Sequence, residues 1–307
     1  MNYTLHQLAI YKKVSELQSV TRASEEMYLT QPAISIQLKK FQEQFSQPLF
    51  EVIGRQLFIT DFGKEIAISA EKILNEVENL DARTLTFNGQ LAGKLKIALV
   101  STAKYVMPYF LTDFIKDNEG VRLSMDVTNK ASVIEGLEKN LVDFAMVSVV
   151  PGDLKVNRIQ LMQNKLFLVG GEQYEMGKSK ISSKAMAKLP MLYREFGSAT
   201  RQAMERYIKQ KNIPNNKRLE LTSNEAVKQA IIAGLGFSIM PLIGIKNELE
   251  TGSIQIIPAT GLPIITNWNI IWLKSKRLSS TAEAFIDYLQ TQKNDIINKS
   301  FDWFEKY

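Results

Sequence analysis

The feature that most constrains the fold is an alternation of strand and helix patterns over about residues 90–307. Apolar segments such as KLKIALV, DFAMVSVV and WNIIWLK alternate with helical stretches, at 104–116, 132–140, 198–210, 224–233 and from Ser280 onward. Repeated strand–helix units predict a mostly parallel sheet that helices cover on both faces. The strands fall into two successive sets, and this division predicts two lobes. Ligands of such folds bind in the crevice beyond the carboxyl ends of the strands.

The first 60 residues or so show a different pattern, in which short helices precede a hairpin. Ser19 is suited to cap the second helix. Thr30 and Pro32 mark the start of a third helix, because proline is tolerated in a first turn, where its missing N–H is not needed. After Pro48, apolar residues alternate around a glycine and Arg55 in LFEVIGRQLFIT. This segment predicts a two-stranded hairpin with a basic tip.

The third helix has two faces of different chemistry. Its apolar face, with spacings of four, three and four, consists of Ile34, Leu38, Phe41 and Phe45. Its opposite face is small, amide-rich and basic, and consists of Gln31, Ser35, Gln37 and Lys39. The apolar face is expected to pack against the other helices, which leaves the polar face for a partner.

Two helices joined by a tight polar turn form the helix-turn-helix pattern, whose second helix enters the major groove of DNA. Small and amide side chains let such a helix approach the base edges, while cations at its rim neutralise phosphates. The residues that this interpretation assigns to DNA are Thr21, Thr30, Gln31, Pro32, Ser35, Ile36, Gln37, Lys39 and Arg55. On spacing alone, a three-helix bundle that does not contact DNA is the alternative.

Residues 61–88 predict one long helix with a narrow apolar seam. The seam residues that we expect to contact a second copy of this helix are Ile66, Ala70, Ile73, Val77 and Leu80. A heptad-like seam on an otherwise polar helix is typical of helix pairing, and here it predicts a homodimer. The alternative is that the seam packs on its own domain.

Two helix starts in the C-terminal part are candidates for ligand binding. STAK (101–104) follows the first strand and REFGSATR (194–201) a later one, and free N–H groups at a helix start favour an anion. Arginine can also bind a carboxylate or phosphate through two hydrogen bonds. The candidate ligand residues are Ser101, Thr102, Lys104, Asn129, Lys130, Ser148, Arg194, Ser198, Thr200 and Arg201. The alternatives are a simple helix cap at 101–102 and ion pairs of the arginines with Glu195 or Glu205.

The distribution of charge supports an anionic ligand for the C-terminal part. The chain has a net charge of +6, while residues 1–88 hold nine Lys and Arg and eleven Asp and Glu, a net charge of −2. The rest of the chain therefore carries +8, and the basic excess lies away from the helices assigned to DNA. Together with the hydroxyl-rich helix starts, this excess predicts a small anionic metabolite.

Composition and motifs argue against other classes of protein. The chain has no cysteine, which excludes disulfides, thiol catalysis and zinc fingers. There is no G-x-S-x-G, Walker or H-E-x-x-H motif, and the single histidine, His6, leaves little for acid–base chemistry, so we expect neither an enzyme nor a metal or cofactor site. No long apolar run or signal peptide is seen, which predicts a cytoplasmic protein without a membrane span. A free-standing cytoplasmic solute-binding sensor is the alternative, but it would leave residues 1–88 unexplained.

The segment from LHQLAIYKK to ITDFGKE resembles the N-terminal domain of LysR-type transcriptional regulators. The matching residues are Ser19, Thr21, Ala23, Leu29, Gln31, Pro32, Ala33, Ser35, Leu49, Phe50, Thr60 and Gly63. Further along, NKASVIEGLEKNLVDFAMV and SNEAVKQAIIAGLGFSIMP are similar to the branch that controls carbon-fixation (Calvin-cycle) operons. The resemblance implies a two-lobed effector domain like that of periplasmic binding proteins, and effectors such as phosphorylated intermediates or NADPH.

The resemblance also implies an organisation and a set of partners. We expect an all-α winged helix-turn-helix domain at 1–60, a linker helix at 61–88 and an α/β effector domain at 89–307. Within the effector domain, one lobe is expected at about 89–162 and 267–307 and the other at 163–266. The implied partners are double-stranded DNA, a small-molecule effector and RNA polymerase, with dimers joined into a homotetramer.

Overall fold

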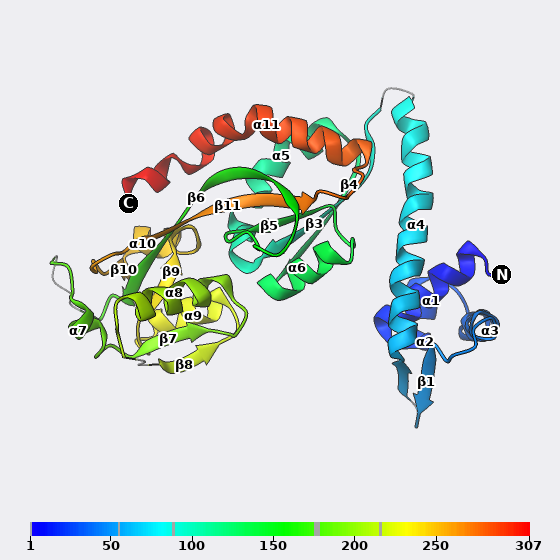
Figure 1. Ribbon diagram of the computed structural model, residues 1–307, viewed down its shortest axis with the longest axis horizontal. Coiled ribbons are helices and arrows are strands. Elements are labelled where there is room, and N and C mark those ends of the chain that lie inside the picture. Colours follow the sequence, from blue (N-terminus) through cyan, green and yellow to red (C-terminus); the bar gives the residue numbers. More distant parts are fainter. Residues whose placement is uncertain (1, 55, 88–89, 175–178, 215–216) are drawn as a thin grey trace. The chain divides into compact units, whose positions relative to one another are not determined.

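The computed structural model describes residues 2–54, 56–87, 90–174, 179–214 and 217–307 (Figure 1). The chain forms two compact units, Met1–Lys94 and Leu95–Tyr307. None of the helices in these described ranges is both long enough and apolar enough to cross a membrane.

The N-terminal unit is a helix-turn-helix followed by a hairpin and a long helix. Its elements are α1 (Leu5–Leu17), α2 (Val20–Glu26), α3 (Gln31–Gln42), β1 (Phe50–Ile53), β2 (Gln56–Ile59) and α4 (Asp61–Phe87). The two strands pair antiparallel, with Phe50 opposite Ile59, and form the predicted wing. The predicted winged helix-turn-helix with a long linker helix is therefore confirmed.

The predicted helix starts are made by side-chain caps. Ser19 Oγ accepts a hydrogen bond from the backbone N–H of Arg22 (3.2 Å), and Thr30 Oγ1 accepts one from Ala33 (3.4 Å). Pro32 lies in the first turn of α3, where no intrahelical donor is needed. Between the helices, Tyr28 adopts a left-handed backbone conformation with φ of 55°, which turns the chain sharply from α2 into α3.

The apolar face of α3 packs into the core of this unit. Ile34, Leu38 and Phe41 are buried there, together with Tyr11 of α1. Phe45 packs against the same core although it lies beyond the end of α3 at Gln42. This arrangement leaves the opposite face of α3 at the surface.

The seam of α4 is divided between two environments. Ala70 is 1% exposed and belongs to the core of the N-terminal unit, and Ile66 packs against that core. The expectation that Ala70 contacts a partner helix is therefore wrong, because the start of α4 packs along α1 of its own domain. Farther along, Ile73 is 41% exposed and Leu80 is 58% exposed, so the apolar seam reaches the surface only there.

The C-terminal unit is an α/β structure of two lobes. Its helices are α5 (Met107–Asp117), α6 (Lys130–Glu138), α7 (Ser183–Met186), α8 (Ala199–Gln210), α9 (Asn224–Ile232), α10 (Lys246–Thr251) and α11 (Ser280–Phe301), with the 3₁₀ helices η1 (Ser101–Tyr105), η2 (Leu242–Gly244) and η3 (Asp302–Lys306). Its strands are β3 (Ala92–Val100), β4 (Gly120–Thr128), β5 (Phe144–Val147), β6 (Val156–Gly171), β7 (Met191–Arg194), β8 (Lys217–Leu221), β9 (Ser238–Pro241), β10 (Ile254–Ile256) and β11 (Ile264–Leu273). Three short elements, α7, α10 and β10, were not predicted from the sequence.

The sheet departs from the predicted parallel arrangement. The main sheet has the order β10-β6-β11-β5-β3-β4, with β9 also paired to β6, while β7 and β8 form a separate parallel pair. β3 and β5 are parallel, but β6 is antiparallel to β9, β10 and β11, and β5 is antiparallel to β11. The prediction of a mostly parallel sheet is wrong, because two long strands carry the chain from lobe to lobe where a strand–helix crossover was expected.

These two long strands are β6 and β11, which pass through both lobes (Figure 1). The predicted lobe boundaries, at 162/163 and 266/267, both fall within the paired region of β6 and β11. The pairing shifts by a bulge between Asn267 and Asn269, next to those boundaries. Beside it, Asn164 Nδ2 donates to Thr266 Oγ1 (3.1 Å) and links the side chains of the two strands.

The C-terminal end of the chain is anchored on β6. Lys165 of β6 is 7% exposed, and its Nζ donates to the carbonyl oxygens of Phe304 (3.1 Å) and Tyr307 (3.0 Å). Because these acceptors belong to η3 and the residue after it, the last turn of the chain is fixed against the strand that both lobes share. Trp303 of η3 thereby gains a defined position on the surface of this unit.

Gly63 provides a test of packing in the N-terminal unit. A Cβ at this position would lie 1.9 Å from Leu49 O and 2.7 Å from Tyr11 Oη, so Gly63→Ala is expected to destabilise this unit by about 1–3 kcal/mol. The matched control is Gly136→Ala in α6, where a Cβ meets nothing within 4 Å and helix propensity should stabilise by about 0.5–1 kcal/mol. Differential scanning calorimetry of the full chain measures both effects, and equal Tm shifts for the two variants would contradict the packing described here.

Candidate DNA-binding face and effector cleft

The residues assigned to DNA lie mostly on the exposed face of α3. Those with exposed side chains are Thr21, Thr30, Gln31, Pro32, Ser35, Ile36 and Lys39. Gln37 is partly buried and accepts a hydrogen bond from Gln7 Nε2 (3.2 Å), which ties α3 to α1. Thr30 serves as the cap of α3, and Arg55 lies outside the described residues.

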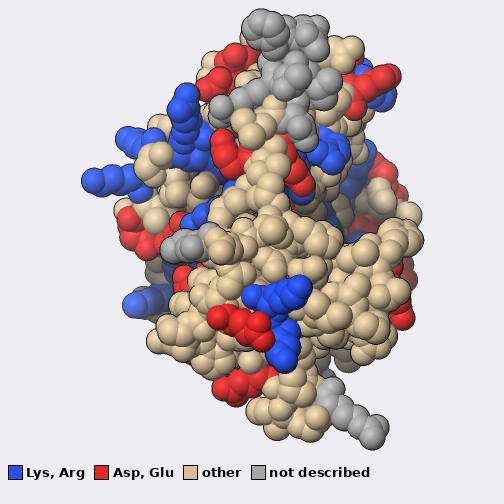
Figure 2. Space-filling view, turned by 90° about the vertical axis from the view of Figure 1, so that its right-hand side faces the viewer, with Lys and Arg blue, Asp and Glu red and all other residues tan. Residues whose placement is uncertain are grey.

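The exposed face of α3 has few charges and small side chains. Ser35 and Pro32 leave room for close approach, and Ile36, 54% exposed, offers an apolar contact of the kind made with thymine methyl groups. Lys39 and Lys40 lie in the last turn, and no ion pair within the described ranges involves them. The side of the molecule shown in Figure 2 likewise has broad uncharged areas around a small group of basic and acidic side chains.

The second candidate site is a cleft between the lobes of the C-terminal unit. Its lining residues are Val100, Ser101, Thr102, Asn129, Lys130, Arg194, Glu195, Ser198, Ala199, Thr200 and Asn224. Seven of the ten predicted ligand residues are therefore brought together here, from segments up to about a hundred positions apart. Glu195 and Asn224 were not predicted as ligand residues.

The cleft is built where strands end and helices begin. Ser101 and Thr102 open η1 directly after β3, and Ser198 and Thr200 flank the start of α8 after β7. The hydroxyl of Ser198 makes no cap hydrogen bond although Ser198 is the N-cap residue of α8, so it is free for a ligand. Backbone N–H groups at such helix starts have no intrahelical acceptor and suit an anion.

Asn129 has a different role from Ser198. Its side-chain oxygen accepts a hydrogen bond from the backbone N–H of Ser132 (3.0 Å) and caps α6. The simple capping role that was considered for residues 101–102 is not found, because the start of η1 has no side-chain cap hydrogen bond. The amide nitrogen of Asn129 is the group that this residue can offer to a ligand.

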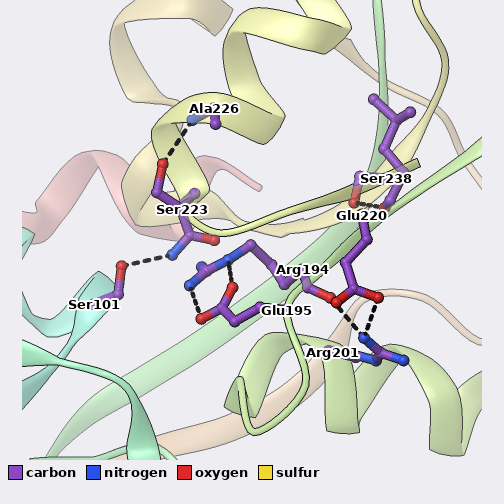
Figure 3. A network of polar contacts seen from close by, with 10 residues as sticks. Ser101, Arg194, Glu195, Arg201, Glu220, Ser223, Ala226 and Ser238 are labelled. Atoms are coloured by element: carbon purple, nitrogen blue, oxygen red, sulfur yellow. Dashed lines mark hydrogen bonds and ion pairs between the residues drawn. The ribbon is translucent and has the colours of Figure 1, made fainter.

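Arg194 is the most buried cation of the cleft. Its side chain is 4% exposed and forms two hydrogen bonds to Glu195, at 2.7 Å and 2.9 Å (Figure 3). The ion-pair alternative is therefore correct for Arg194, yet the pair lines the cleft and leaves further guanidinium donors available. Such a fork is suited to a carboxylate or phosphate in a position fixed by Glu195.

Lys130 is the second cation. Burial lowers the pKa of Lys130, and the nearby charge of Arg206 lowers it further. A bound anion would favour the charged form of this amine. With Arg194 and Glu195, the charged groups that line the cleft sum to one positive charge, which favours an anionic ligand.

Arg201 does not belong to the cleft. It forms ion pairs with Glu205 (2.7 Å) and Glu220 (2.9 Å). It also donates to the carbonyl oxygen of Arg194 (3.1 Å), and Figure 3 shows its contacts with Glu220 and Arg194. These hydrogen bonds, that to Glu205 foremost, raise the pKa of Arg201. The prediction that Arg201 binds the effector is therefore corrected. Arg201 links α8 to β7 and β8, and its hydrogen bond to the carbonyl oxygen of Arg194 helps to fix the position of that residue.

Two further predicted ligand residues lie elsewhere. Lys104 is exposed, one turn along η1 from Ser101, and its Nζ lies 5.0 Å from the ring centroid of Tyr105. Ser148 is 8% exposed after β5 but does not line the cleft. Position at a strand or helix end alone did not distinguish these two residues from the side chains that face the ligand.

Two contacts hold the lobes together across the cleft. Asn224 Nδ2 donates to Ser101 Oγ (3.3 Å), and Lys130 Nζ donates to Gln202 Oε1 (3.5 Å). The space between the lobes is about 10 Å³, comparable to the room that one water needs. A metabolite can therefore enter only when the lobes part or when these side chains move.

Asn224 carries a buried polar atom that the protein does not satisfy. The residue is 4% exposed, and its Oδ1 has no hydrogen-bond partner among the described residues. A buried unpaired amide costs about 1–3 kcal/mol, so a ligand that pairs with it gains affinity. Since the Ser101 hydroxyl can either donate or accept, either end of the amide can face the ligand. The only sequence signal for Asn224 was its place at a helix start after a strand.

A winged helix-turn-helix unit joined to a two-lobed ligand-binding unit defines a one-component DNA-binding regulator. The LysR substrate binding domain matches residues 88–294, and the bacterial regulatory helix-turn-helix domain of the lysR family matches residues 5–64. The chain belongs to the LysR family of transcriptional regulators. Within the described residues, no group of acidic or histidine side chains is arranged to hold a metal ion.

The proteins to which the chain is similar include regulators of RuBisCO operons. It is 33% identical to the transcriptional activator CmpR of Synechocystis, over 94% of this chain and 95% of that protein. It is also 33% identical to the RuBisCO operon transcriptional regulator of Allochromatium vinosum, over 95% of this chain and 97% of that protein. The predicted resemblance to the carbon-fixation branch is thereby confirmed.

Solved structures agree with the fold. The regulatory domain of Synechocystis CcmR, solved in complex with 2-PG, is 31% identical with a TM-score of 0.63, and the match covers 66% of this chain and 98% of that one. The LysR-family regulator CbnR matches 94% of this chain and 98% of its own with a TM-score of 0.72, and at 18% identity it supports the fold alone.

The structural role of Arg201 can be tested without a ligand. Arg201→Gln is expected to destabilise the C-terminal unit by about 1–2 kcal/mol, because two ion pairs and a backbone hydrogen bond are lost. Lys209→Gln, at an exposed position of the same helix, should change stability by less than about 0.5 kcal/mol. Urea unfolding followed by circular dichroism measures both, and an Arg201→Gln protein as stable as the control would contradict this role.

Proposed function

We propose that this regulator binds a small metabolite with two acidic groups, of the phosphorylated-acid type, between the lobes of its C-terminal unit. The observation that carries the proposal is the convergence of Lys130 and Arg194 with the hydroxyls of Thr102, Ser198 and Thr200 in one cleft. The regulatory domain of a relative at 31% identity was solved with 2-PG, a small anionic metabolite, which supports the same ligand class for this chain.

The ligand is proposed to act on DNA binding through the lobes. Entry requires the contacts of Asn224 with Ser101 and of Lys130 with Gln202 to open or to be replaced by contacts with the ligand. A ligand shifts such an equilibrium only by its difference in affinity for the two arrangements. Pairing the unsatisfied amide of Asn224 would supply part of that difference.

We further propose that two copies of the chain pair through the exposed part of the α4 seam. Ile73, Val77 and Leu80 lie beyond the domain core and would form the helix contact, with Ile66 at its edge. Pairing would present two α3 helices to successive major grooves of one DNA face. Effector domains would join dimers into a homotetramer, and a ligand-dependent bend of the DNA would alter the recruitment of RNA polymerase, all in the cytoplasm and without catalysis.

Isothermal titration calorimetry with 2-phosphoglycolate tests the effector site. Thr200→Val, which keeps the shape of the side chain but removes its hydroxyl, should weaken binding about 10-fold, in line with the loss of a hydrogen bond to a charged group. Arg194→Gln should weaken it further. Ser148→Ala is the matched control, because this buried hydroxyl does not line the cleft. The Ser148→Ala protein should bind 2-phosphoglycolate with unchanged affinity. Binding of only neutral or cationic compounds would refute the proposal.

Fluorescence anisotropy with operator and scrambled duplexes tests the DNA face. Ser35→Ala and Pro32→Ala should reduce the preference for the operator, while Lys39→Gln and Arg55→Ala should weaken binding to both duplexes. Each of these two losses of charge is expected to lower the slope of log affinity against log salt by about 1. Lys12→Gln, on α1 and paired with Glu16 (2.6 Å), is the control. If the slope of log affinity against log salt were unchanged in Arg55→Ala, the wing would not contact DNA.

A further inference from the structure

A second cavity of the C-terminal unit is larger than the effector cleft. It measures about 190 Å³, against about 10 Å³ for the cleft, and so has room for a small organic molecule in the present conformation. Its walls come from η1 and α5, from α9 and α10, and from the end of α11 with η3. The lining residues that matter here are Tyr105, Tyr109, Lys228, Lys246, Glu248 and Trp303.

Among the residues that line the cavity are the aromatic side chains Tyr105, Tyr109, Phe301 and Trp303. Tyr109 is 51% exposed, and its ring packs edge-on against Phe301, with the centroids 5.1 Å apart. Tyr105 and Trp303 contribute further rings from η1 and η3. Such side chains favour a planar, unsaturated ligand, because stacked and edge-on ring pairs are attractive beyond the area they bury.

The two lysines that line the cavity differ in how strongly carboxylates neutralise their charge. Lys228 forms ion pairs with Glu248 (2.8 Å) and Glu225 (3.0 Å), so its charge is already satisfied. Lys246 lies 3.9 Å from Glu250, and both side chains are well exposed, which makes that pair weak. Lys246 Nζ also lies 5.1 Å from the ring centroid of Trp303. The ammonium group of Lys246, beside the ring of Trp303, is therefore the positive charge that can pair with a ligand.

We propose that this cavity is a second ligand site, which takes a planar aromatic ring carrying one acidic group. The ring would lie among Tyr105, Tyr109 and Trp303, and the acidic group would pair with Lys246. This ligand class differs from that proposed for the cleft, whose lining residues include hydroxyls, amides and two cations but no aromatic side chain. The second site is defined by the cavity itself and does not depend on the effector proposed for the cleft.

The second site is connected to the cleft by two shared elements. On α9, Asn224 lines the cleft and Lys228, one turn later, lines the cavity. On η1, Ser101 lines the cleft and Tyr105 the cavity. The hydrogen bond between Asn224 and Ser101 joins these same two elements across the lobes. A ligand that fixes α9 against η1 at one site is therefore expected to change affinity at the other.

Trp303 provides a local signal for binding. The chain has three tryptophans, and the other two, Trp268 and Trp272, are 0% and 8% exposed within the core. Titration of the full-length protein with benzoate, 4-hydroxybenzoate and indole-3-carboxylate should give saturable binding by calorimetry, and benzoate, which absorbs little at the tryptophan excitation wavelength, should also change the tryptophan fluorescence. Cyclohexanecarboxylate, which has the charge without the aromatic ring, and benzylamine, which has a ring with the opposite charge, should bind at least about 10-fold more weakly.

Variants separate this site from the cleft. Lys246→Gln and Tyr109→Leu should each weaken the aromatic acids about 10-fold, as expected for the loss of one charge or ring contact. Lys299→Gln, an exposed position of α11 outside the cavity, and Arg194→Gln in the cleft should leave the affinity unchanged. Binding that is lost in Arg194→Gln but kept in Lys246→Gln would overturn the proposal, as would no saturable binding of any of the three acids or equal binding of cyclohexanecarboxylate.

Discussion

The antiparallel pairing of β6 with β11 is the contact on which the rest of the C-terminal unit depends. β6 pairs with β11 from Val156 to Leu166, and its far end pairs with β9 and β10. One lobe is therefore tied to the other by main-chain hydrogen bonds along these strands, which leaves the opposite side of the two lobes free to form a cleft. Lys165, on the same strand, fixes the C-terminal turn and with it one wall of the second cavity.

The cleft is lined by several junctions of the same kind, each between a strand and a helix. A strand ends, a helix begins, and the residues at the junction present hydroxyl, amide and N–H groups to the space between the lobes. The buried Arg194 and the partly buried Lys130 add positive charge. The guanidinium of Arg194 is held by Glu195, and its backbone carbonyl by a hydrogen bond from Arg201. Because Asn224 and Ser101 already touch across the cleft, small changes in ligand contacts there can alter how α9 lies against η1. The effector cleft and the aromatic cavity thus depend on the same pair of elements.

Much of the candidate site could be predicted, because a helix start after a strand is visible in sequence. Ser101, Thr102, Ser198 and Thr200 were found by that rule, and all four line the cleft. The rule failed for Arg201 of α8, whose partner Glu220 is nineteen positions away on β8. It also gave no priority to Asn224, because an unsatisfied amide is a property of packing and not of spacing. The local sequence pattern predicted where helices begin. It did not predict which protein groups hydrogen-bond to each side chain and so keep it from a ligand.

By itself the sequence determined the type of each main element, the caps at Ser19 and Thr30, and the apolar face of α3, because these depend on residues within a few positions of one another. Only the tertiary structure decided that Ala70 lies in the core of its own domain, that β6 and β11 join the lobes antiparallel, and that Ser101 meets Asn224. Contacts of this second kind join residues from about sixty to more than a hundred positions apart. No local periodicity records which of many chemically suitable partners the fold brings within hydrogen-bond distance.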